Sequence, residues 1–256
     1  MGEASGAIYP DLAGKTVVVT GGASGIGESI VAHFARQKAK VGFLDIKTDE
    51  GNALAGRLLK ERSQVHFEAC DLTDVEALRV SIAAVRERFG PIGILINNAG
   101  HDERHVTEEV TSPYFDERIA VNLKQQFFAA QAVLSDMKSL GGGSIVNFGS
   151  TSWMIGLGGM AVYTAAKSAV IGLTRSLARD YGQYSIRVNA IAPGWIMTKR
   201  QIELWLTAEG EQSIMSNQCL KRKLEPDDIA RFVVFLASDE AGACTAQHYV
   251  VDGGWV

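Results

Sequence analysis

Short apolar runs rich in β-branched residues recur along the chain, and segments with helical spacing of apolar residues separate them. Runs of this length, bounded by glycine or charged residues, predict buried strands, whereas apolar residues at every third or fourth position predict helices. The predicted strands cover residues 15–21, 40–45, 65–71, 92–100, 143–150, 185–194 and 247–254. The predicted helices cover residues 25–39, 49–63, 74–90, 226–239 and two longer segments at about 113–138 and 160–181.

Strands and helices therefore alternate from one end of the chain to the other. This alternation predicts right-handed βαβ units, and so an α/β fold with a single doubly wound Rossmann-type parallel sheet and helices on both faces. We expect residues 1–256 to form one dinucleotide-binding and catalytic domain. Residues 195–222 separate the sixth strand from the last helix by more than a loop requires, which predicts a lid over a ligand.

Composition and charge exclude several classes of protein. The chain has 256 residues and a net charge of −4, and it has no basic run, so no nucleic-acid partner is expected. Its three cysteines are widely spaced and form no CxxC motif, which argues against disulfides and against a metal site. No segment approaches about 18 uncharged apolar residues, and no signal peptide is recognisable. We therefore expect a cytoplasmic protein without a membrane partner.

The first predicted strand runs directly into the glycine-rich stretch TGGASGIG, residues 20–27. Gly21 allows a tight turn, Gly25 allows close approach to a pyrophosphate, and Gly27 allows close packing of helix on sheet. The N-terminus of the following helix presents free amides to an anion. With Asp45 at the end of the second strand, this context predicts a dinucleotide site.

Asp45 also indicates which dinucleotide binds. A carboxylate at this position accepts hydrogen bonds from the adenosine ribose hydroxyls and repels a 2′-phosphate. Ser24 precedes Gly25, so no cation stands there to hold such a phosphate, although Lys47 lies close in sequence. The sequence therefore favours NAD, with NADP as the weaker alternative.

A largely apolar helix carries Tyr163 and Lys167 four residues apart. This spacing places both side chains on one helix face, one turn from each other. Alone, the pair is better explained by a lysine that extends past a half-buried tyrosine to reach water than by a catalytic role. A free tyrosine has a pKa of about 10, too high for a base at neutral pH, and an adjacent ammonium favours the phenolate.

Several motifs together resemble the short-chain dehydrogenase/reductase family, in the order and spacing of that family and across essentially the whole chain. They are TGxxxGIG at 20–27, NNAG at 97–100, Ser150, YTAAK at 163–167 and PG at 193–194.

The resemblance implies a role for each reacting residue. Tyr163 would be the acid/base group, and Lys167 would lower its pKa and bind the nicotinamide ribose. Ser150 would hold the substrate oxygen, and Asn122 would help to hold a water of the proton relay. The resemblance also implies cofactor contacts along the chain. They are Gly21, Ser24, Gly25, Ile26, Gly27, Asp45, Ile46, Asp71, Leu72, Asn98, Ala99, Gly100, Tyr163, Lys167, Pro193, Gly194, Ile196 and Thr198.

Stretches outside these motifs look like the bacterial aldose 1-dehydrogenases that act on pentoses, which oxidise C1 of a cyclic sugar to the lactone. The polar and aromatic residues expected around a sugar are Ser150, Ser152, Trp153, His101, Asp102, Arg104 and Gln201. Xylose enzymes of this kind have asparagine after NNAG, whereas this chain has His101. L-arabinose, D-xylose and D-galactose therefore all remain open as substrates.

Other functions share some of these motifs. The alternatives are oxidation of a secondary alcohol of a polyol or keto-deoxy sugar acid, reduction of 3-ketoacyl carriers, and dinucleotide binding without catalysis. The acyl-carrier reaction would usually use NADPH and a basic surface, which Asp45 and the net charge of −4 oppose. The non-catalytic function is disfavoured because Tyr163 and Lys167 are both present. The family resemblance also implies a homotetramer with D₂ symmetry.

Overall fold

The computed structural model describes residues 6–256, and its centre is a seven-stranded parallel sheet in the order β3-β2-β1-β4-β5-β6-β7. The first five residues, on which the expected absence of a signal peptide partly depends, lie outside the described part. The strands are β1 (Thr16–Thr20), β2 (Lys40–Asp45), β3 (Gln64–Ala69), β4 (Ile92–Asn97), β5 (Gly143–Phe148), β6 (Ile186–Pro193) and β7 (His248–Val251). The predicted doubly wound parallel sheet is confirmed.

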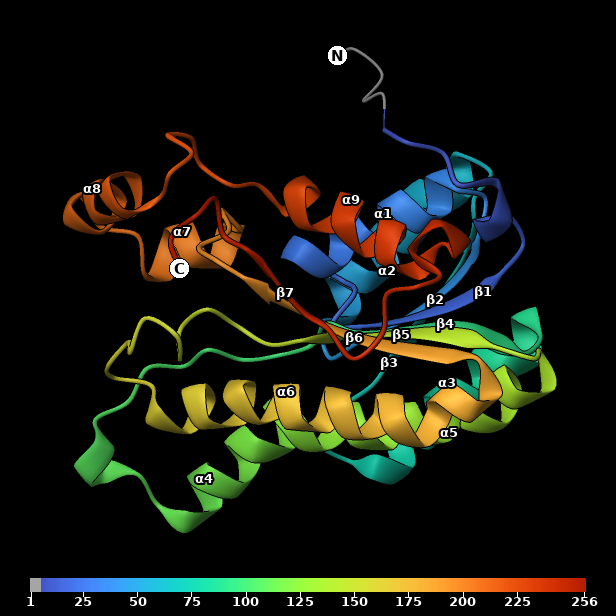
Figure 1. Cartoon of the computed structure of the whole chain (residues 1–256), viewed down its shortest axis with the longest axis horizontal. Helices are drawn as coiled ribbons and strands as arrows, with labels where there is room; N and C mark the ends of the chain where they lie inside the picture. Colours follow the sequence, from blue (N-terminus) through green and yellow to red (C-terminus); the bar gives the residue numbers. More distant parts are fainter. Residues whose placement is uncertain (1–5) are drawn as a thin grey trace.

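Helices cover both faces of this sheet (Figure 1). On one face lie α1 (Gly25–Arg36), α2 (Thr48–Lys60) and α9 (Pro226–Ala237). On the other lie α3 (Val75–Phe89), α4 (Ser112–Ile119), α5 (Gln125–Ser139) and α6 (Ala161–Tyr181). Short 3₁₀ turns occupy Pro10–Leu12, Thr107–Glu109, Gly182–Tyr184 and Asp239–Ala241.

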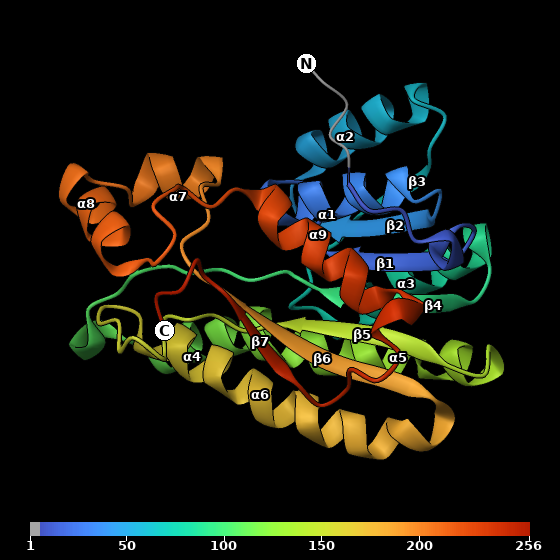
Figure 2. The ribbon, with the colours of Figure 1, turned by 45° about the horizontal axis from the view of Figure 1, so that its top comes forward.

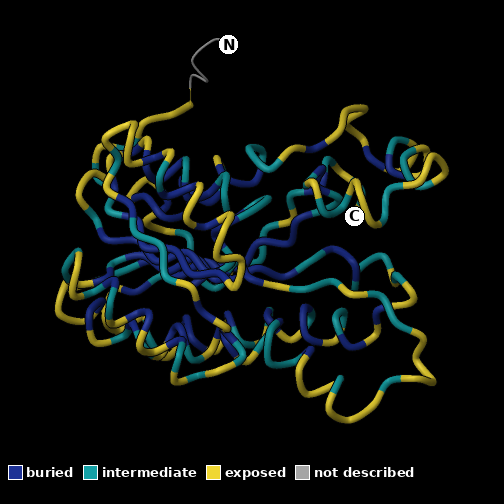
Figure 3. Tube along the Cα trace, turned by 180° about the vertical axis from the view of Figure 1, so that it is seen from behind, coloured by how far each residue is buried: buried dark blue, intermediate teal, exposed yellow. Residues whose placement is uncertain are grey.

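Each strand supplies side chains to two apolar cores, one on each side of the sheet. In β1, Val17 and Val19 pack into the core beneath α1 and α9, while Val18 packs into the opposite core. This follows from the alternation of side chains along a strand. Figure 3 shows the result as a buried sheet between partly exposed helices.

The long helix predicted at about 113–138 is interrupted. A π-helical turn, η3 (Ala120–Lys124), lies between α4 and α5. Periodicity did not predict this turn, because one extra residue per turn barely changes an apolar pattern. Such single π turns often occur at functional sites.

The segment predicted as a lid contains two short helices, α7 (Lys199–Leu204) and α8 (Ala208–Asn217). Thr198 caps α7 by accepting a hydrogen bond from the Gln201 amide, and Thr207 caps α8 in the same way from Gly210. Both helices project beyond the carboxyl ends of the strands (Figures 1 and 2). Among residues 6–256, no helix is long and apolar enough to cross a membrane.

Candidate active site

A cavity of about 1540 Å³ opens at the carboxyl ends of the strands, between the glycine-rich loop and the lid. It exceeds the roughly 300–1,000 Å³ of a typical pocket for a drug-sized molecule. Every residue expected to contact the cofactor lines it, as do Ser150, Ser152, His101, Asp102, Arg104 and Gln201. The topology thus brings together residues that lie far apart in the sequence.

The glycine-rich loop leaves space and free amides for an anion. Gly21 has φ of 66°, and a Cβ at Gly27 would lie 1.8 Å from the Gly21 carbonyl oxygen, so only glycine fits there. Ser24 precedes α1 without capping it through its side chain, which leaves the first-turn amides unsatisfied. An uncapped helix N-terminus beside a backbone that approaches closely fits the pyrophosphate of a dinucleotide.

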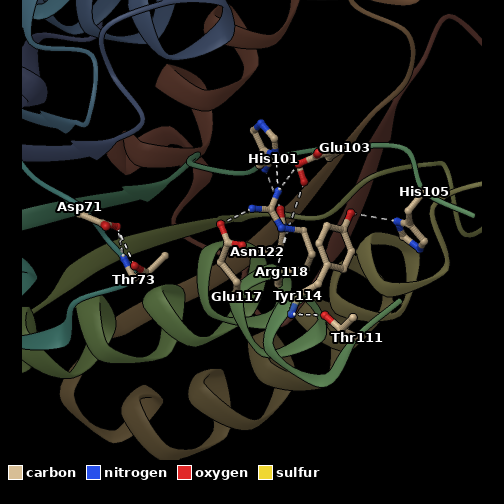
Figure 4. A network of polar contacts seen from close by, with 10 residues as sticks. All are labelled: Asp71, Thr73, His101, Glu103, His105, Thr111, Tyr114, Glu117, Arg118 and Asn122. Atoms are coloured by element: carbon tan, nitrogen blue, oxygen red, sulfur yellow. Dashed lines mark hydrogen bonds and ion pairs between the residues drawn. The ribbon is translucent and has the colours of Figure 1, made fainter. Parts of the chain in front are cut away.

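Asp45 is buried at the end of β2, where it organises the loop beside it. Its carboxylate accepts hydrogen bonds from the backbone amides of Ala23 and Lys47, both at 3.0 Å. The Lys47 ammonium donates to the Ser24 hydroxyl at 3.3 Å. Further along the wall, Asp71 accepts hydrogen bonds from the amide and hydroxyl of Thr73 (Figure 4). The Asp45 carboxylate, fixed by these two amides, fits the diol of a ribose.

Tyr163 and Lys167 lie on one face of α6, as predicted. The Lys167 side chain is buried, and its Nζ donates to the Phe148 carbonyl at 2.9 Å and lies 5.7 Å from the centroid of the Tyr163 ring. Burial lowers the pKa of Lys167 to about 8, while the charge of Asp102 raises it. Burial therefore makes the charged form of Lys167 less favourable than that of a lysine in water.

The expected lowering of the Tyr163 pKa by Lys167 is not found in this structure. Burial and the charge of Asp102 raise that pKa, and only a hydrogen bond with Ser150 lowers it. The physical reason is that the Lys167 ammonium is itself destabilised by burial and is held by a backbone carbonyl. A base at this position therefore needs further positive charge in the site.

Two serines follow β5. The Ser150 hydroxyl accepts a hydrogen bond from the Ser152 amide at 3.1 Å. The Ser152 hydroxyl is buried at the cavity wall and has no hydrogen-bond partner within residues 6–256. Both hydroxyls are therefore placed to contact a ligand.

Asn122 lies in the π-helical turn and is fully buried, but it does not line the cavity. Its Oδ1 accepts from the His101 amide at 2.9 Å, and its Nδ2 donates to the carbonyls of His101 and Arg118. The side chain therefore fixes the backbone of the segment that follows β4. Its part in holding a water stays a prediction.

At the other end of the cavity, Asp102 connects the loop after β4 to the lid. Its carboxylate accepts from Arg200 Nε at 3.2 Å and from Gln201 Nε2 at 2.6 Å. Trp153, which was expected near the sugar, does not line this cavity in the structure. Trp153 lies in the turn that begins at Thr151, and its ring stacks on that of His248, with ring centroids 6.3 Å apart.

The sequence interpretation missed a different aromatic group. Trp195 lines the cavity, and the Arg104 guanidinium lies 5.9 Å from its ring centroid and 4.9 Å from that of Trp205. Because Trp195 directly follows the PG motif, the sequence could have indicated its place at the cavity. No motif lies beside Trp205, so the sequence could not have indicated its place. Across residues 6–256, no cluster of three or more His, Cys, Asp or Glu side chains is placed to hold a metal.

Known proteins resemble the chain over nearly its whole length. A family model described as enoyl-(acyl carrier protein) reductase matches residues 21–256. A D-xylose 1-dehydrogenase of Caulobacter vibrioides is 47% identical, with 98% of this chain and 99% of that protein covered. A probable galactose dehydrogenase of Rhizobium meliloti is 45% identical, with 96% of each covered.

A solved structure shares the fold as well. It is a 7α-hydroxysteroid dehydrogenase in complex with NADH and 7-oxo glycochenodeoxycholic acid, and it matches with a TM-score of 0.92. It is 31% identical, and the match covers 96% of each chain. Sequence, fold and site motifs agree, and the chain belongs to the short-chain dehydrogenase/reductase family.

Proposed function

We propose that the protein is an NAD-dependent dehydrogenase that oxidises C1 of a pentose or related aldose, such as L-arabinose, D-xylose or D-galactose, to the lactone. The observation that carries the proposal is that Ser150, Tyr163 and Lys167 line one cavity. The far end of this cavity is a polar wall formed by Asp102, Arg104 and Gln201. The identities of 47% and 45% to sugar dehydrogenases support an aldose as the substrate.

The residues of the glycine-rich end would hold the cofactor. The α1 N-terminus would bind the pyrophosphate, Asp45 would bind the adenosine ribose, and Lys167 would bind the nicotinamide ribose. When bound, the oxidised nicotinamide ring accepts a hydride and adds positive charge to the site. We favour NAD over NADP because the buried Asp45 carboxylate repels a 2′-phosphate.

The side chains of β5 and α6 would manage the proton. Tyr163 as phenolate takes the proton of the C1 hydroxyl, the Lys167 ammonium stabilises that phenolate, and the Ser150 hydroxyl holds the oxygen. C1 of a cyclic aldose carries its hydroxyl and its hydrogen next to the ring oxygen. As the hydride leaves, this oxygen shares the developing positive charge, which makes C1 the easiest carbon of the sugar to oxidise.

The polar wall suits a polyhydroxylated substrate. Asp102, Arg104 and Gln201 offer donors and acceptors for hydroxyls, and Trp195 offers an aromatic face to a sugar ring. Because Asp102 bonds to Arg200 and Gln201, the lid would be held over the sugar and exclude water.

An NADH absorbance screen tests the proposal. L-arabinose, D-xylose, D-galactose and L-fucose are compared with polyols and sugar acids, and the product of each active substrate is identified. We expect the highest kcat/KM for an aldose, with a lactone as product. Turnover of secondary alcohols alone, with no activity on any aldose, would contradict C1 oxidation but not a dehydrogenase.

We also propose a homotetramer with D₂ symmetry. β7 is an edge strand, and α9 carries the partly buried aromatic residues Phe232 and Phe235 against the same side of the molecule. An edge strand beside apolar side chains is an aggregation hazard unless a second subunit covers it. Light scattering that detects a stable monomer at micromolar concentration would contradict this assembly.

A further inference from the structure

His101 is fixed at the entrance to the polar wall. It follows Gly100, where an added Cβ would lie 2.9 Å from Lys167 Nζ, so its backbone runs beside the reacting groups. The buried Asn122 side chain holds both polar backbone atoms of His101, at 2.9 and 3.1 Å. His101 is among the residues that line the cavity. A ring on so rigid a backbone occupies a defined place.

The ring is held through one nitrogen. His101 Nδ1 contacts Nη1 of Arg118, whose side chain is 8% exposed beneath it (Figure 4). The guanidinium also donates to Glu117 at 2.5 Å and to Glu103 at 3.2 Å, and it lies 5.4 Å from the centroid of the Tyr114 ring. Arg118 is therefore held by several contacts in addition to the one with His101.

This contact determines the tautomer. A guanidinium is always protonated and can only donate, so His101 Nδ1 must be the acceptor and the ring proton lies on Nε2. Glu103 Oε2 lies 3.5 Å from Nδ1 and would pair with it in an imidazolium. The same oxygen instead accepts from Arg118 Nη1. Burial and the charges of Arg200 and Arg118 lower the pKa of His101, against the raising effect of Glu103 and Asp102.

We propose that His101 selects the substrate by donating a hydrogen bond from Nε2–H to one sugar hydroxyl distant from C1, with Arg118 as the positioning residue that sets the tautomer. This inference rests on the proposed aldose dehydrogenase function. A donor fixed in this way favours sugars that place a hydroxyl oxygen opposite it and disfavours those that do not, because a bound sugar that covers the donor without accepting its hydrogen bond leaves it without a partner.

Two substitutions separate the donor from the rest of the ring. His101→Asn places its amide near the position of Nδ1 and can still accept from Arg118, but it has no group at the position of Nε2. His101→Gln reaches that position with an amide donor. Each variant is assayed with the preferred aldose and with its singly deoxygenated analogues at positions other than C1.

We expect wild type to lose about 10- to 100-fold in kcat/KM on one of these deoxy sugars. In His101→Asn that discrimination should fall to less than about threefold, and His101→Gln should restore part of it. An equal reduction of kcat/KM for the parent sugar and every analogue would overturn the proposal. A wild-type enzyme that oxidises no aldose contradicts the proposed function itself, and with it this inference, before any variant is compared.

The role of Arg118 has its own readout. In Arg118→Met, Nδ1 can carry the ring proton and donate it to Glu103, so the neutral ring presents Nε2 as an acceptor and kcat/KM for the preferred sugar should fall at neutral pH. The pKa of His101 should also rise, and because the imidazolium regains Nε2–H, kcat/KM relative to wild type should recover on the acidic side. The same discrimination between sugars should also weaken. A folded variant with the wild-type pH profile and discrimination would overturn the positioning role. If Arg118→Met does not fold, Arg118→Lys is used, since one ammonium cannot serve Nδ1 and Glu103 as the planar guanidinium does.

Discussion

The two ends of the cavity are built by different means. The end formed by β1 and β2 is shaped mainly by the backbone. It consists of the glycines of the loop, the free amides of α1 and one buried carboxylate, Asp45. At the other end, side chains from distant segments hold one another, as when Asp102 bonds to Gln201 of the lid. The first end suits a ligand shared by many enzymes. The second end can vary without disturbing the first, and it can therefore determine the substrate.

The largest expected effect lies where the two ends meet. Tyr163→Phe removes the proton acceptor and keeps the ring, so kcat should fall by about 10²–10⁴-fold while NAD affinity stays nearly unchanged. Steady-state kinetics and fluorescence titration of the nucleotide measure the two quantities. Retention of more than a few per cent of activity would contradict the role of Tyr163.

The backbone-built end should tolerate no added atom. In Gly27→Ala the new Cβ would lie 1.8 Å from a backbone oxygen, so we expect the free energy of unfolding to drop by more than about 3 kcal/mol. Gly56→Ala is the matched control, because Gly56 lies within α2 with nothing within 4 Å of the new Cβ. It should stabilise by about 0.5–1 kcal/mol. Denaturant unfolding compares them, and equal effects would show that the loop is not tightly packed.

Cofactor choice should change without any change of substrate. Asp45→Ala removes the charge that repels a 2′-phosphate, so the ratio of kcat/KM with NADP to that with NAD should rise about 10- to 100-fold. The order of preference among the sugars should stay the same. A wild-type enzyme that already prefers NADP would show that Lys47, not Asp45, dominates this wall.

The smallest effect concerns the buried lysine. The pKa of Lys167 is about 8 in the folded chain against 10.5 as its reference, so the unfolded chain binds more protons between these values. Stability from this group therefore rises with pH in that window. The unfolding free energy of wild type minus that of Lys167→Met, measured without added nucleotide, should increase by about 1–2 kcal/mol from pH 8 to about pH 9.5, whichever of the two proteins is more stable at pH 8. A difference that is constant or shrinks would contradict the lowered pKa.

The sequence predicted the backbone-built end well. The glycines of the loop and Asp45 lie at strand ends within a short segment, so a local pattern is enough to locate them. The order of strands and helices was predicted for the same reason, since each element leaves its own periodicity. The family resemblance, which rests on these motifs, is confirmed by the comparisons.

The side-chain-built end was predicted only in part. His101 and Arg104 line the cavity, and their contact with a sugar stays a prediction, but nothing in the pattern paired His101 with Arg118, seventeen positions away in the sequence. Trp153 was assigned to the sugar because it is aromatic and follows Ser150, yet a turn directs it toward β7. Side-chain direction and long-range pairing depend on the packed structure, which periodicity does not encode.

The central claim is that the hydride leaves C1 of an aldose. The most direct test is oxidation of the preferred sugar labelled with deuterium at C1, followed by mass spectrometry of the nucleotide and identification of the sugar product. Our account predicts that the deuterium moves to the reduced nicotinamide, that turnover slows by a primary isotope effect wherever hydride transfer limits the rate, and that a lactone forms. A reduced nucleotide without deuterium, together with a sugar product that keeps it at C1, would contradict the account.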